Sequence, residues 1–509
     1  MELTLYSLND YTRLLEGEGL LAAPAPTGLD PDRTVELVTC SSQECVPGTL
    51  FIRKGAHFRP EYLADAGCRG AFAYVSDAPD PAAGLPCIQV NDLRRAMALL
   101  AVRYYNDPSR DLSVIGITGT KGKSSTAYYV KAILDRYLAT AGKRCGVISS
   151  IDTYDGMEEF ESHLTTPEPL ELQRHLANAR AAGLGYVVME ASSQALKYHR
   201  TLGTRFAAAA FLNIGRDHIS PIEHPDFEDY FQSKLKLFAQ TEVACVNLDC
   251  ERADDILAAA RAACPKVLTF SRRDGSADLY GSGAAKEGHG ARFHAKGLGL
   301  DREFTLSMPG LFNVDNALAA IALCRCLSIP EDAIAAGLAE ARVPGRMEVY
   351  ASRDGRITAI VDYAHNRMSF ETLFRSVREE YPGRHIAAVF GCPGGKAFER
   401  RRDLGEVSGR WSDLVVLTEE DSGEEDTLSI CREIAGYVDA QGCREIIEPD
   451  RGAAIRLALT ECRTPLVALI TGKGAETRQK RGTAYIDTPS DVDYVLEFLR
   501  EYDRTHSEE

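Results

Sequence analysis

Short apolar runs alternate with longer amphipathic stretches along the whole chain, and polar turns separate them. Short apolar runs between turn residues are typical of buried strands, and apolar residues at helical spacing predict amphipathic helices. The pattern therefore predicts an α/β protein. The runs that predict strands are Val35–Thr39, Thr49–Ile52, Gly70–Val75 and Cys87–Val90, then Val114–Thr118, Gly185–Glu190 and Ala208–Asn213, and finally Ile357–Asp362, His385–Gly391, Leu414–Thr418 and Leu466–Thr471.

These runs fall into three sections, which we interpret as three domains. A predicted helix over Asp92–Tyr105 and a linker-like turn over Asn106–Ser109 close the first section, an α/β domain of residues 1–108. Residues 109–337 are predicted to form a central domain of the P-loop ATPase type, built on a parallel sheet. The alternation restarts in residues 338–509, which indicates a separately wound, Rossmann-like third domain.

The central section opens with a candidate phosphate-binding loop. The strand Val114–Thr118 ends in Gly119-Thr120-Lys121-Gly122-Lys123-Ser124-Ser125, and a helical pattern follows. Glycines allow backbone N–H groups to surround an anion, the lysine reaches the β- and γ-phosphates, and the first serine binds Mg²⁺. The strict motif requires glycine where Ile117 stands, so the match is to a shorter variant, GTxGKS. The alternative is an ordinary glycine-rich turn.

Two further strand ends carry residues suited to a metal site. Glu190 ends one apolar run and His218 follows another, and the carboxyl ends of parallel strands lie at the same edge of a sheet. Together with Ser124 they are candidate Mg²⁺ ligands, although Glu190 also suits a helix start and His218 a structural role. Lys234 lies on the apolar face of a helical stretch over 227–238. The ammonium of such a lysine usually extends toward water. A buried lysine must instead lose its charge or gain a partner. One functional route is reaction with CO₂, which gives a carbamate that can bind metal.

Composition narrows the class of partner. The 509-residue chain is 45% hydrophobic and carries a net charge of −16, which disfavours nucleic acid as a partner. Its 14 cysteines lack metal-ligand spacing, and we find neither a signal peptide nor an apolar run that would span a membrane. We expect a cytoplasmic, monomeric protein that acts on small molecules and binds neither nucleic acid nor membrane.

Nine motifs occur in a fixed order: GTKGKSST, the triplet Thr165-Thr166-Pro167, MEASSQAL, LNIGRDH, EDYFQSKLKLF, PGLFNVDNALAA, VPGRME, VDYAHN and TGKGAET. Together they resemble the Mur ligases, ATP-dependent amide-bond synthetases of bacterial cell-wall assembly, and most closely the tripeptide-forming MurE type. The resemblance spans essentially the whole chain. It implies a UDP-binding domain at 1–108, an ATP-binding domain at 109–337 and an amino-acid-binding domain at 338–509.

The resemblance also implies residue roles. In the central domain it assigns ATP and Mg²⁺ to the phosphate loop, Glu190, His218 and a carbamylated Lys234. It assigns nucleotide contacts to Asn313, Asn316, Arg346 and Asp362, UDP-muramoyl contacts to Ser41, Ser42, Thr165, Thr166, Ser193 and Arg200, and the amino acid to Gly472 and Glu476. Simpler alternatives exist, since the asparagines suit helix caps, Arg346 a surface loop and GKGAET a plain turn. The family's Asp-Ser-Arg is absent at Ser41-Ser42.

The implied reaction activates the carboxylate of UDP-N-acetylmuramoyl-L-Ala-D-Glu as an acyl-phosphate, which the amine of a diamino acid then attacks. Relatives that add meso-diaminopimelate carry Asp-Asn-Pro-Arg, whereas the corresponding stretch here, LTEEDSGEED, has no arginine. Its acidic residues favour L-lysine, because they attract a terminal ammonium and repel a second carboxylate. These residues are Glu419, Glu420, Asp421, Glu424, Glu425 and Asp426. A solvated loop without selective role, or ornithine or diaminopimelate as substrate, remains open.

Departures from the family pattern fall mostly near the substrate sites: Ala475, Tyr198, Asn366-Arg367 and, in the phosphate loop, Lys121. Two other functions therefore stay open beside the muramoyl ligase. One is a ligase of the folylpolyglutamate synthase type, which the 108 residues before the loop disfavour. The other is an inactive ATP-binding regulatory protein, which the intact candidate metal and phosphate residues disfavour.

Overall fold

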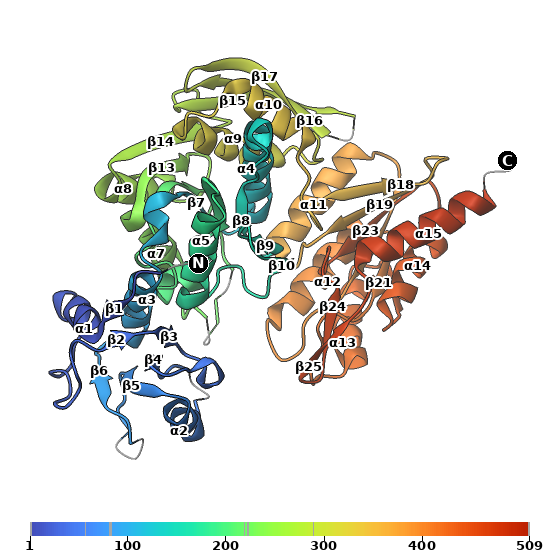
Figure 1. Ribbon diagram of the computed structural model, residues 1–509. Helices are drawn as coiled ribbons and strands as arrows, with labels where there is room; N and C mark the ends of the chain where they lie inside the picture. Colours follow the sequence, from blue (N-terminus) through green and yellow to red (C-terminus); the bar gives the residue numbers. More distant parts are fainter. Residues whose placement is uncertain are drawn as a thin grey trace. The chain divides into compact units, whose positions relative to one another are not determined.

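The computed structural model describes residues 3–55, 58–80, 84–217, 219–220, 223–288 and 290–506 (Figure 1). Its internal contacts divide the chain into two compact units. The first unit comprises Met1–Tyr280 and Leu318–Ile334, and the second comprises Gly281–Ala317 and Ala335–Glu509. The predicted α/β class is confirmed, because each unit is built on parallel strands flanked by helices.

The N-terminal part of the first unit is a four-stranded parallel sheet in the order β3-β4-β5-β6. Alternate side chains of a strand point to opposite faces. In β4, Leu50 and Ile52 accordingly pack in the core with α1 and α3, whereas Phe51 packs with α2 on the other face. The elements are β1 (Tyr6–Ser7), α1 (Leu8–Gly17), β2 (Thr34–Val35), β3 (Leu37–Thr39), β4 (Thr49–Ile52), α2 (Pro60–Cys68), β5 (Ala71–Ser76), β6 (Cys87–Gln89) and α3 (Leu93–Tyr104).

The central sheet of the first unit has β7 (Ser113–Thr118) between β11 (Tyr186–Glu190) and β12 (Phe206–Phe211), all parallel. Gly116 lets β12 approach, since a Cβ there would lie 2.8 Å from the Phe206 ring. Further parallel strands are β8 (Gly146–Ile148), β13 (Thr241–Asn247) and β14 (Lys266–Ser271), and β9 (Asp152–Tyr154) and β10 (Glu159–Glu161) form an antiparallel edge. The helices are α4 (Lys123–Leu138), α5 (Pro169–Ala181), α6 (Ser193–Lys197), α7 (Phe227–Leu235) and α8 (Ala253–Ala263).

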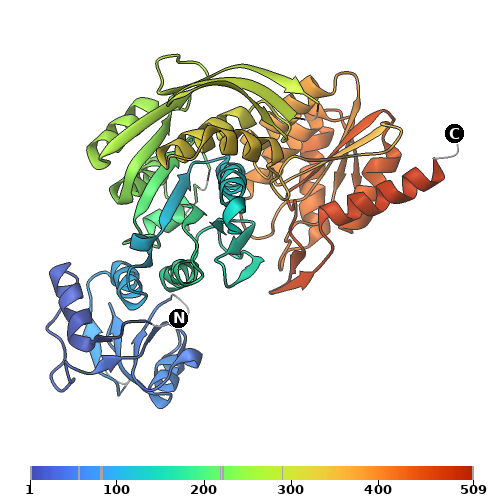
Figure 2. The same cartoon turned by 45° about the horizontal axis from the view of Figure 1, so that its top comes forward.

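Antiparallel strands are the feature that the sequence analysis did not identify. The strands β15 (Leu279–Glu287), β16 (Gly290–Gly297) and β17 (Leu300–Leu306) follow one another in space, and β16 pairs antiparallel with β17 (Figure 2). In β16, Ala291, Phe293 and Ala295 are buried and alternate with more exposed residues. Residues 109–337 therefore do not form a purely parallel α/β array. Helices α9 (Asn313–Cys326) and α10 (Glu331–Glu340) complete this stretch.

The C-terminal sheet of the second unit has the order β18-β19-β23-β20-β21-β22 and is parallel except for β18. Both faces are covered, which explains the almost continuous apolar runs of its central strands. One face packs against α14 and α15, and Phe370 of α11 contacts Phe390 of β20. The strands are β18 (Glu348–Ala351), β19 (Ile357–Asp362), β20 (His385–Phe390), β21 (Leu414–Leu417), β22 (Arg444–Ile447) and β23 (Leu466–Thr471). The helices are α11 (Arg367–Glu380), α12 (Glu399–Trp411), α13 (Thr427–Asp439), α14 (Arg451–Glu461) and α15 (Asp491–Thr505), and a hairpin of β24 (Arg478–Arg481) and β25 (Ala484–Asp487) precedes α15.

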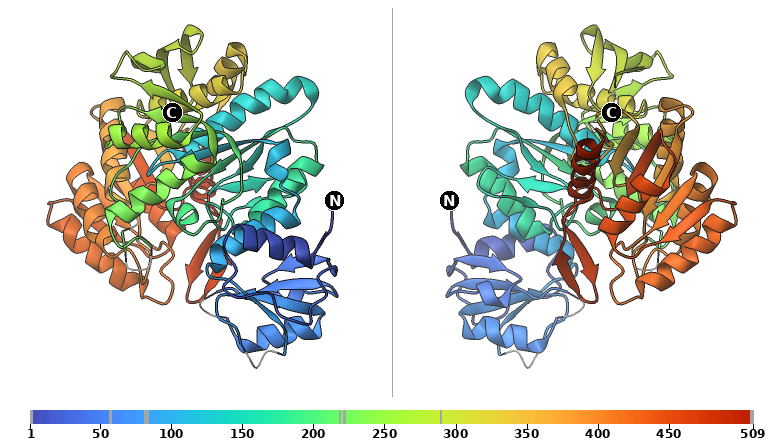
Figure 3. Two further views of the ribbon diagram at one scale, coloured as in Figure 1. Left: turned by 90° about the vertical axis from the view of Figure 1, so that its left-hand side faces the viewer. Right: turned by 90° about the vertical axis from the view of Figure 1, so that its right-hand side faces the viewer.

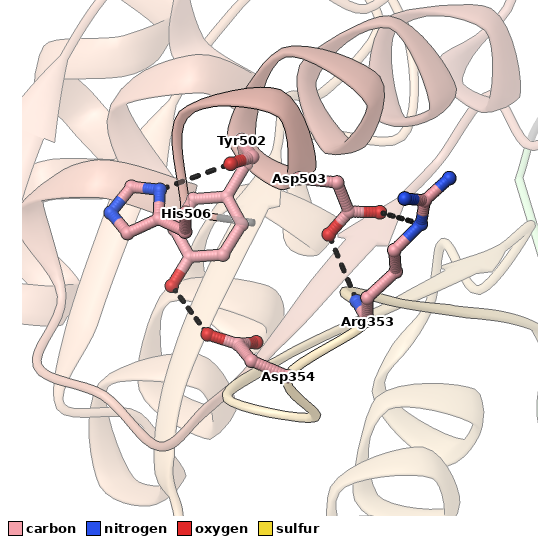
Figure 4. A pocket seen from close by; sticks show the side chains of 5 residues that line it. All are labelled: Arg353, Asp354, Tyr502, Asp503 and His506. Carbon is pink, nitrogen blue, oxygen red and sulfur yellow. Dashed lines mark hydrogen bonds and ion pairs between the residues drawn. The ribbon is translucent and has the colours of Figure 1, made fainter. Parts of the chain in front are cut away.

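Helix α15, dark red in Figure 3, is held to this sheet at both ends. At its start, Asp491 accepts from Arg451 Nε and Nη2 at 2.6 and 2.7 Å, and both side chains are buried. Arg451 also donates to the backbone oxygens of Glu419 and Thr471. At its end, a shallow pocket lined by Arg353, Asp354, Tyr502, Asp503 and His506 contains the bond from Tyr502 Oη to Asp354, 3.0 Å long (Figure 4). None of the predicted site residues lines this pocket.

Asp491→Ala is expected to destabilise the second unit by about 3–5 kcal/mol, because it leaves the Arg451 guanidinium buried without its charge partner. Urea unfolding followed by fluorescence measures this effect, since the single tryptophan, Trp411, lies on α12 of the same unit. Glu461→Ala is the control, because Glu461 pairs with Arg444 on the exposed surface and such pairs contribute about 0–1 kcal/mol. Equal shifts in the two variants would contradict the argument.

Candidate active site

The phosphate loop turns at two glycines in the left-handed region. Gly119 has φ +154° and Gly122 has φ +84°, and Gly122 is the N-cap of α4. Such angles are favourable for glycine and costly for other residues. Asn213, at the end of β12, holds the loop: its Oδ1 accepts from Lys121 N at 2.9 Å and its Nδ2 donates to Lys121 O at 3.0 Å. The loop is therefore fixed before any ligand binds.

Ser124 and Glu190 belong to one hydrogen-bonded group. Ser150, just after β8, lies with its Oγ 3.1 Å from Ser124 Oγ and donates through N and Oγ to Glu190 Oε1 at 2.9 and 3.2 Å. Glu190 is buried at the carboxyl end of β11. A hydroxyl and a carboxylate oxygen at this spacing suit Mg²⁺, which prefers oxygen ligands. The third predicted ligand, His218, lies outside the described residues.

Two lysines share one carbonyl oxygen in this loop. Gly119 O accepts from Lys123 Nζ at 3.1 Å and from Lys234 Nζ at 3.0 Å. Lys234 belongs to α7 and is buried. Its Nζ lies 4.6 Å from the centre of the Tyr230 ring. Burial, and then the nearby Lys123 charge, hold the pKa of Lys234 well below its usual range. An uncharged amine is the form that reacts with CO₂, so the site fits a carbamylated lysine.

The predicted UDP-muramoyl contacts of the central domain lie next to Glu190. Thr166 Oγ1 donates to Glu190 O at 2.8 Å, and Arg200 donates to Thr166 O at 3.2 Å. Arg200 and Lys54 both form ion pairs with Glu168. Ser193 begins α6 three positions after Glu190, and Thr165 precedes Thr166 in the same loop. Ser41 follows β3, and Ser42 begins a short 3₁₀ helix, Ser42–Glu44.

In the second unit, predicted site residues gather at the carboxyl ends of β19 and β23. Asp362 accepts from the backbone N–H groups of Met347 and Ala364, and the Arg346 guanidinium lies 4.2 Å from the centre of the Tyr363 ring. Tyr363 Oη donates to Glu476 Oε1 at 2.7 Å. Gly472 follows β23. At the start of α9, Asn313 donates to Pro309 O and Asn316 donates to Asn313 Oδ1, so both amides already serve the local backbone and each other.

The acidic loop after β21 is mostly neutralised by basic residues from other segments of the second unit. Glu419 pairs with Arg481, Asp421 with Lys473 and Glu425 with Arg401, while Asp426 caps α13. Glu424 is exposed, and Glu420 is buried. Among the described residues, Glu420 Oε2 has no hydrogen-bond partner, and a Cβ on Gly472 would lie 2.1 Å from this oxygen. Burial raises the pKa of Glu420 to about 7.

Sequence reasoning missed four residues that organise these groups: Ser150, Tyr230, His224 and Lys473. Tyr230 Oη lies 3.0 Å from Thr120 Oγ1, and His224 Nε2 lies 3.0 Å from Ser193 Oγ. Ser150 had a usable signal, because it follows an apolar run at the same sheet edge as Glu190. Tyr230 and Lys473 lie within motifs already recognised and His224 lies between two of them, but neither spacing nor residue type indicated their partners.

The chain belongs to the Mur ligase family. The family model of the Mur ligase middle domain matches residues 117–324, and that of the Mur ligase glutamate ligase domain matches residues 345–474. Among curated relatives, a UDP-N-acetylmuramyl-tripeptide synthetase of Lactobacillus delbrueckii subsp. bulgaricus is 36% identical over 96% of this chain and 98% of its own. A UDP-N-acetylmuramoyl-L-alanyl-D-glutamate--L-lysine ligase of Enterococcus faecalis is 36% identical over 91% of each chain.

Solved structures share the fold. A UDP-N-acetylmuramoyl-L-alanyl-D-glutamate--2,6-diaminopimelate ligase has a TM-score of 0.67 at 23% identity, covering 99% of this chain and 100% of its own. MurF ligase of Thermotoga maritima in complex with ADP has a TM-score of 0.60 at 16% identity, covering 92% and 98%. The family resemblance is thus confirmed, and the protein is an ATP-dependent ligase that adds an amino acid in peptidoglycan precursor synthesis. Within the described residues, no helix has the length and apolarity needed to cross a membrane.

Proposed function

We propose that this ligase joins L-lysine to UDP-N-acetylmuramoyl-L-Ala-D-Glu through an acyl-phosphate, with ATP and Mg²⁺. The observation that carries the choice of lysine is the buried Glu420 carboxyl beside Gly472, in a loop that holds no arginine. A carboxylate there complements a side-chain ammonium, and nothing in the loop complements a second carboxylate. The lysine ligases among the relatives support the same choice.

The reaction would proceed in two balanced steps. A carboxylate oxygen of the muramoyl dipeptide attacks the γ-phosphorus of ATP and ADP leaves; the lysine amine then attacks the acyl carbon, loses a proton and displaces phosphate. Lys123 would contact the transferred phosphoryl oxygens. Ser124, Glu190, His218 and a carbamylated Lys234 would hold Mg²⁺, which supplies positive charge to the phosphates when bound. The need for ATP supports a cytoplasmic location.

The other roles follow the family assignments and are part of the proposal. Asn313, Asn316, Arg346 and Asp362 would contact the nucleotide, and Gly472 and Glu476 the lysine. Ser41, Ser42, Thr165, Thr166, Ser193 and Arg200 would contact the UDP-muramoyl dipeptide. We assign UDP binding to residues 1–108, ATP binding to 109–337 and amino-acid binding to 338–509.

Phosphate release tests the function directly. With ATP, Mg²⁺ and UDP-N-acetylmuramoyl-L-Ala-D-Glu present, L-lysine is expected to support turnover, and meso-diaminopimelate and L-ornithine are not. Lys123→Ala should lower kcat about 10²–10³-fold, the usual cost of losing one group that stabilises transition-state charge. Turnover with diaminopimelate would overturn the choice of lysine, and no turnover with any amino acid would overturn the proposed substrate.

Lys234 is expected to carry a carbamate. Protein equilibrated with ¹³C-bicarbonate should show a carbamate carbon resonance, and depletion of CO₂ should lower activity until bicarbonate is restored. Lys234→Gln should abolish both the resonance and the response to bicarbonate. Lys236→Gln, which changes an exposed lysine two positions away, should retain both. A resonance that persists in Lys234→Gln would place the carbamate elsewhere.

Glu420→Gln is expected to raise the KM for lysine about tenfold or more, a loss of ~1.4 kcal/mol or greater. Because the pKa of Glu420 is about 7, the carboxylate predominates above that pH and the neutral acid below it. The KM of the unmodified enzyme for lysine should therefore rise as the pH falls through about 7. Glu424→Gln, in the same loop but exposed, should preserve the KM and its pH dependence. If the pH dependence survives in Glu420→Gln, another group recognises the ammonium.

A further inference from the structure

We propose that His224 is a positioning residue that takes up the hydroxyl proton of Ser193, so that Ser193 meets the UDP-muramoyl substrate only as a hydrogen-bond acceptor. This inference rests on the proposed function, which makes Ser193 a substrate contact. It goes further by assigning a role to His224 and Asp229 and by stating which kind of substrate group Ser193 recognises.

Three groups form a continuous chain of hydrogen bonds. Ser193 begins α6, His224 lies in the segment between β12 and α7, and Asp229 lies in the first turn of α7. His224 Nε2 lies 3.0 Å from Ser193 Oγ, and His224 Nδ1 lies 2.6 Å from Asp229 Oδ2. Ser193 and His224 are buried, with 5% and 0% of their surfaces exposed. The bond between Ser193 and His224 therefore joins two groups that water barely reaches.

Lys197, one turn after Ser193 on α6, completes the arrangement. Its ammonium donates to Asp229 Oδ2 at 2.7 Å and to Glu223 O at 3.0 Å. Burial raises the pKa of the Asp229 carboxyl, but the bonds from Lys197 and His224 outweigh it and leave the pKa below its usual range. Asp229 is thus ionised, and its charge is already balanced by that of Lys197.

The direction of each bond follows from this charge state. An ionised carboxylate only accepts, so His224 Nδ1 carries a proton. A second proton on the ring would place a cation in a buried site whose anion is already paired with Lys197, which is unfavourable. Nε2 therefore keeps its lone pair and accepts the Ser193 hydroxyl proton. Since a hydroxyl has one proton to donate, the Ser193 oxygen has only lone pairs left for a ligand.

An acceptor-only Ser193 selects the chemistry of its partner. It binds a peptide N–H or a hydroxyl and gives no hydrogen bond to a carboxylate or phosphate oxygen. Ser193 lies three positions after Glu190, and in the proposed function both border the substrate, whose carboxylate is the nucleophile. A donating hydroxyl there would bind that carboxylate and reduce its nucleophilicity. The His224–Asp229 pair prevents this competition and directs Ser193 to an N–H of the dipeptide.

The order serine, histidine, aspartate also occurs in serine hydrolases, where the carboxylate is buried and the serine attacks the substrate. In this protein the exposures differ from those of a hydrolase. The Ser193 side chain is buried, whereas that of Asp229 is one-third exposed and paired with Lys197. We therefore assign a positioning role and expect no labelling of Ser193 by a fluorophosphonate. Covalent labelling at Ser193 would overturn this assignment.

The tautomer of His224 is the direct test and needs no substrate. In the full chain with ¹⁵N-labelled histidine, the resonances lost in His224→Asn identify the ring. Nδ1 is expected to show the shift of a protonated nitrogen and Nε2 that of an unprotonated one. A protonated Nε2 would overturn the proposal, whatever the enzyme's activity proves to be.

Kinetics test the consequence. His224→Asn keeps a side chain near Asp229 but loses the contact with Ser193. This variant should raise the KM for the UDP-muramoyl dipeptide about tenfold, or ~1.4 kcal/mol. Its KM for ATP should be unchanged. Ser193→Ala should have a similar effect, and the double variant should be no worse than Ser193→Ala, because His224 acts through Ser193. Additive effects, or an equal rise in the KM for ATP, would contradict the proposal.

Asp226→Asn is the matched control. Asp226 lies on the same helix and caps it, but it makes no recorded contact with His224, so its variant should keep the KM for the dipeptide. If the unmodified enzyme shows no turnover with any amino acid, the proposed function fails while the ¹⁵N result still decides the role of His224. The two failures are therefore distinguishable.

Discussion

The proposed nucleotide site depends on the carbonyl oxygen of Gly119. It accepts hydrogen bonds from both Lys123 and Lys234, and two ammonium groups cannot share one buried acceptor without strong repulsion. Burial, and then the nearby Lys123 charge, hold the pKa of Lys234 well below its usual range. In the proposed site, one backbone oxygen thus contacts two chemically identical side chains with different tasks, Lys123 for phosphate and Lys234 for CO₂. The left-handed turn at Gly119, pinned by Asn213, sets the position of that oxygen.

Much of this arrangement could be predicted from sequence because it follows from local rules. Strand, glycine turn and helix predict the phosphate loop, and the parallel sheet brings Glu190 to the same edge. The predicted strands of all three sections also match the structure closely, although Val35–Thr39 is divided between β2 and β3, and β12 begins two residues earlier than predicted. The strands β15–β17, which include the antiparallel β16–β17 pair, were missed because their alternating pattern is shared with many half-exposed segments, and only the pairing partner distinguishes them.

The parts that escaped prediction depend on side-chain partners distant in sequence. Composition indicates that the loop after β21 is acidic, but not that Arg401, Lys473 and Arg481 neutralise most of it. Likewise, the motif around Ser193 does not reveal that a histidine 31 positions later contacts it. Charge counts along a segment therefore say little about its electrostatic potential until the fold has paired the charges. Among the acidic residues of this loop, Glu420 is the buried one whose Oε2 has no hydrogen-bond partner among the described residues, which is why we propose it as the group that recognises the ligand.

The close contact of Gly472 with Glu420 has an evolutionary consequence. Gly472 also has φ +100°, a backbone conformation that other residues rarely adopt, so a side chain at position 472 would be strained even if the Glu420 carboxyl moved aside. The glycine is therefore required by its own backbone angle as well as by the neighbouring acid. Under the proposed role of Glu420, a lineage that altered its cell-wall amino acid would change the acid at 420 while the glycine at 472 stayed in place.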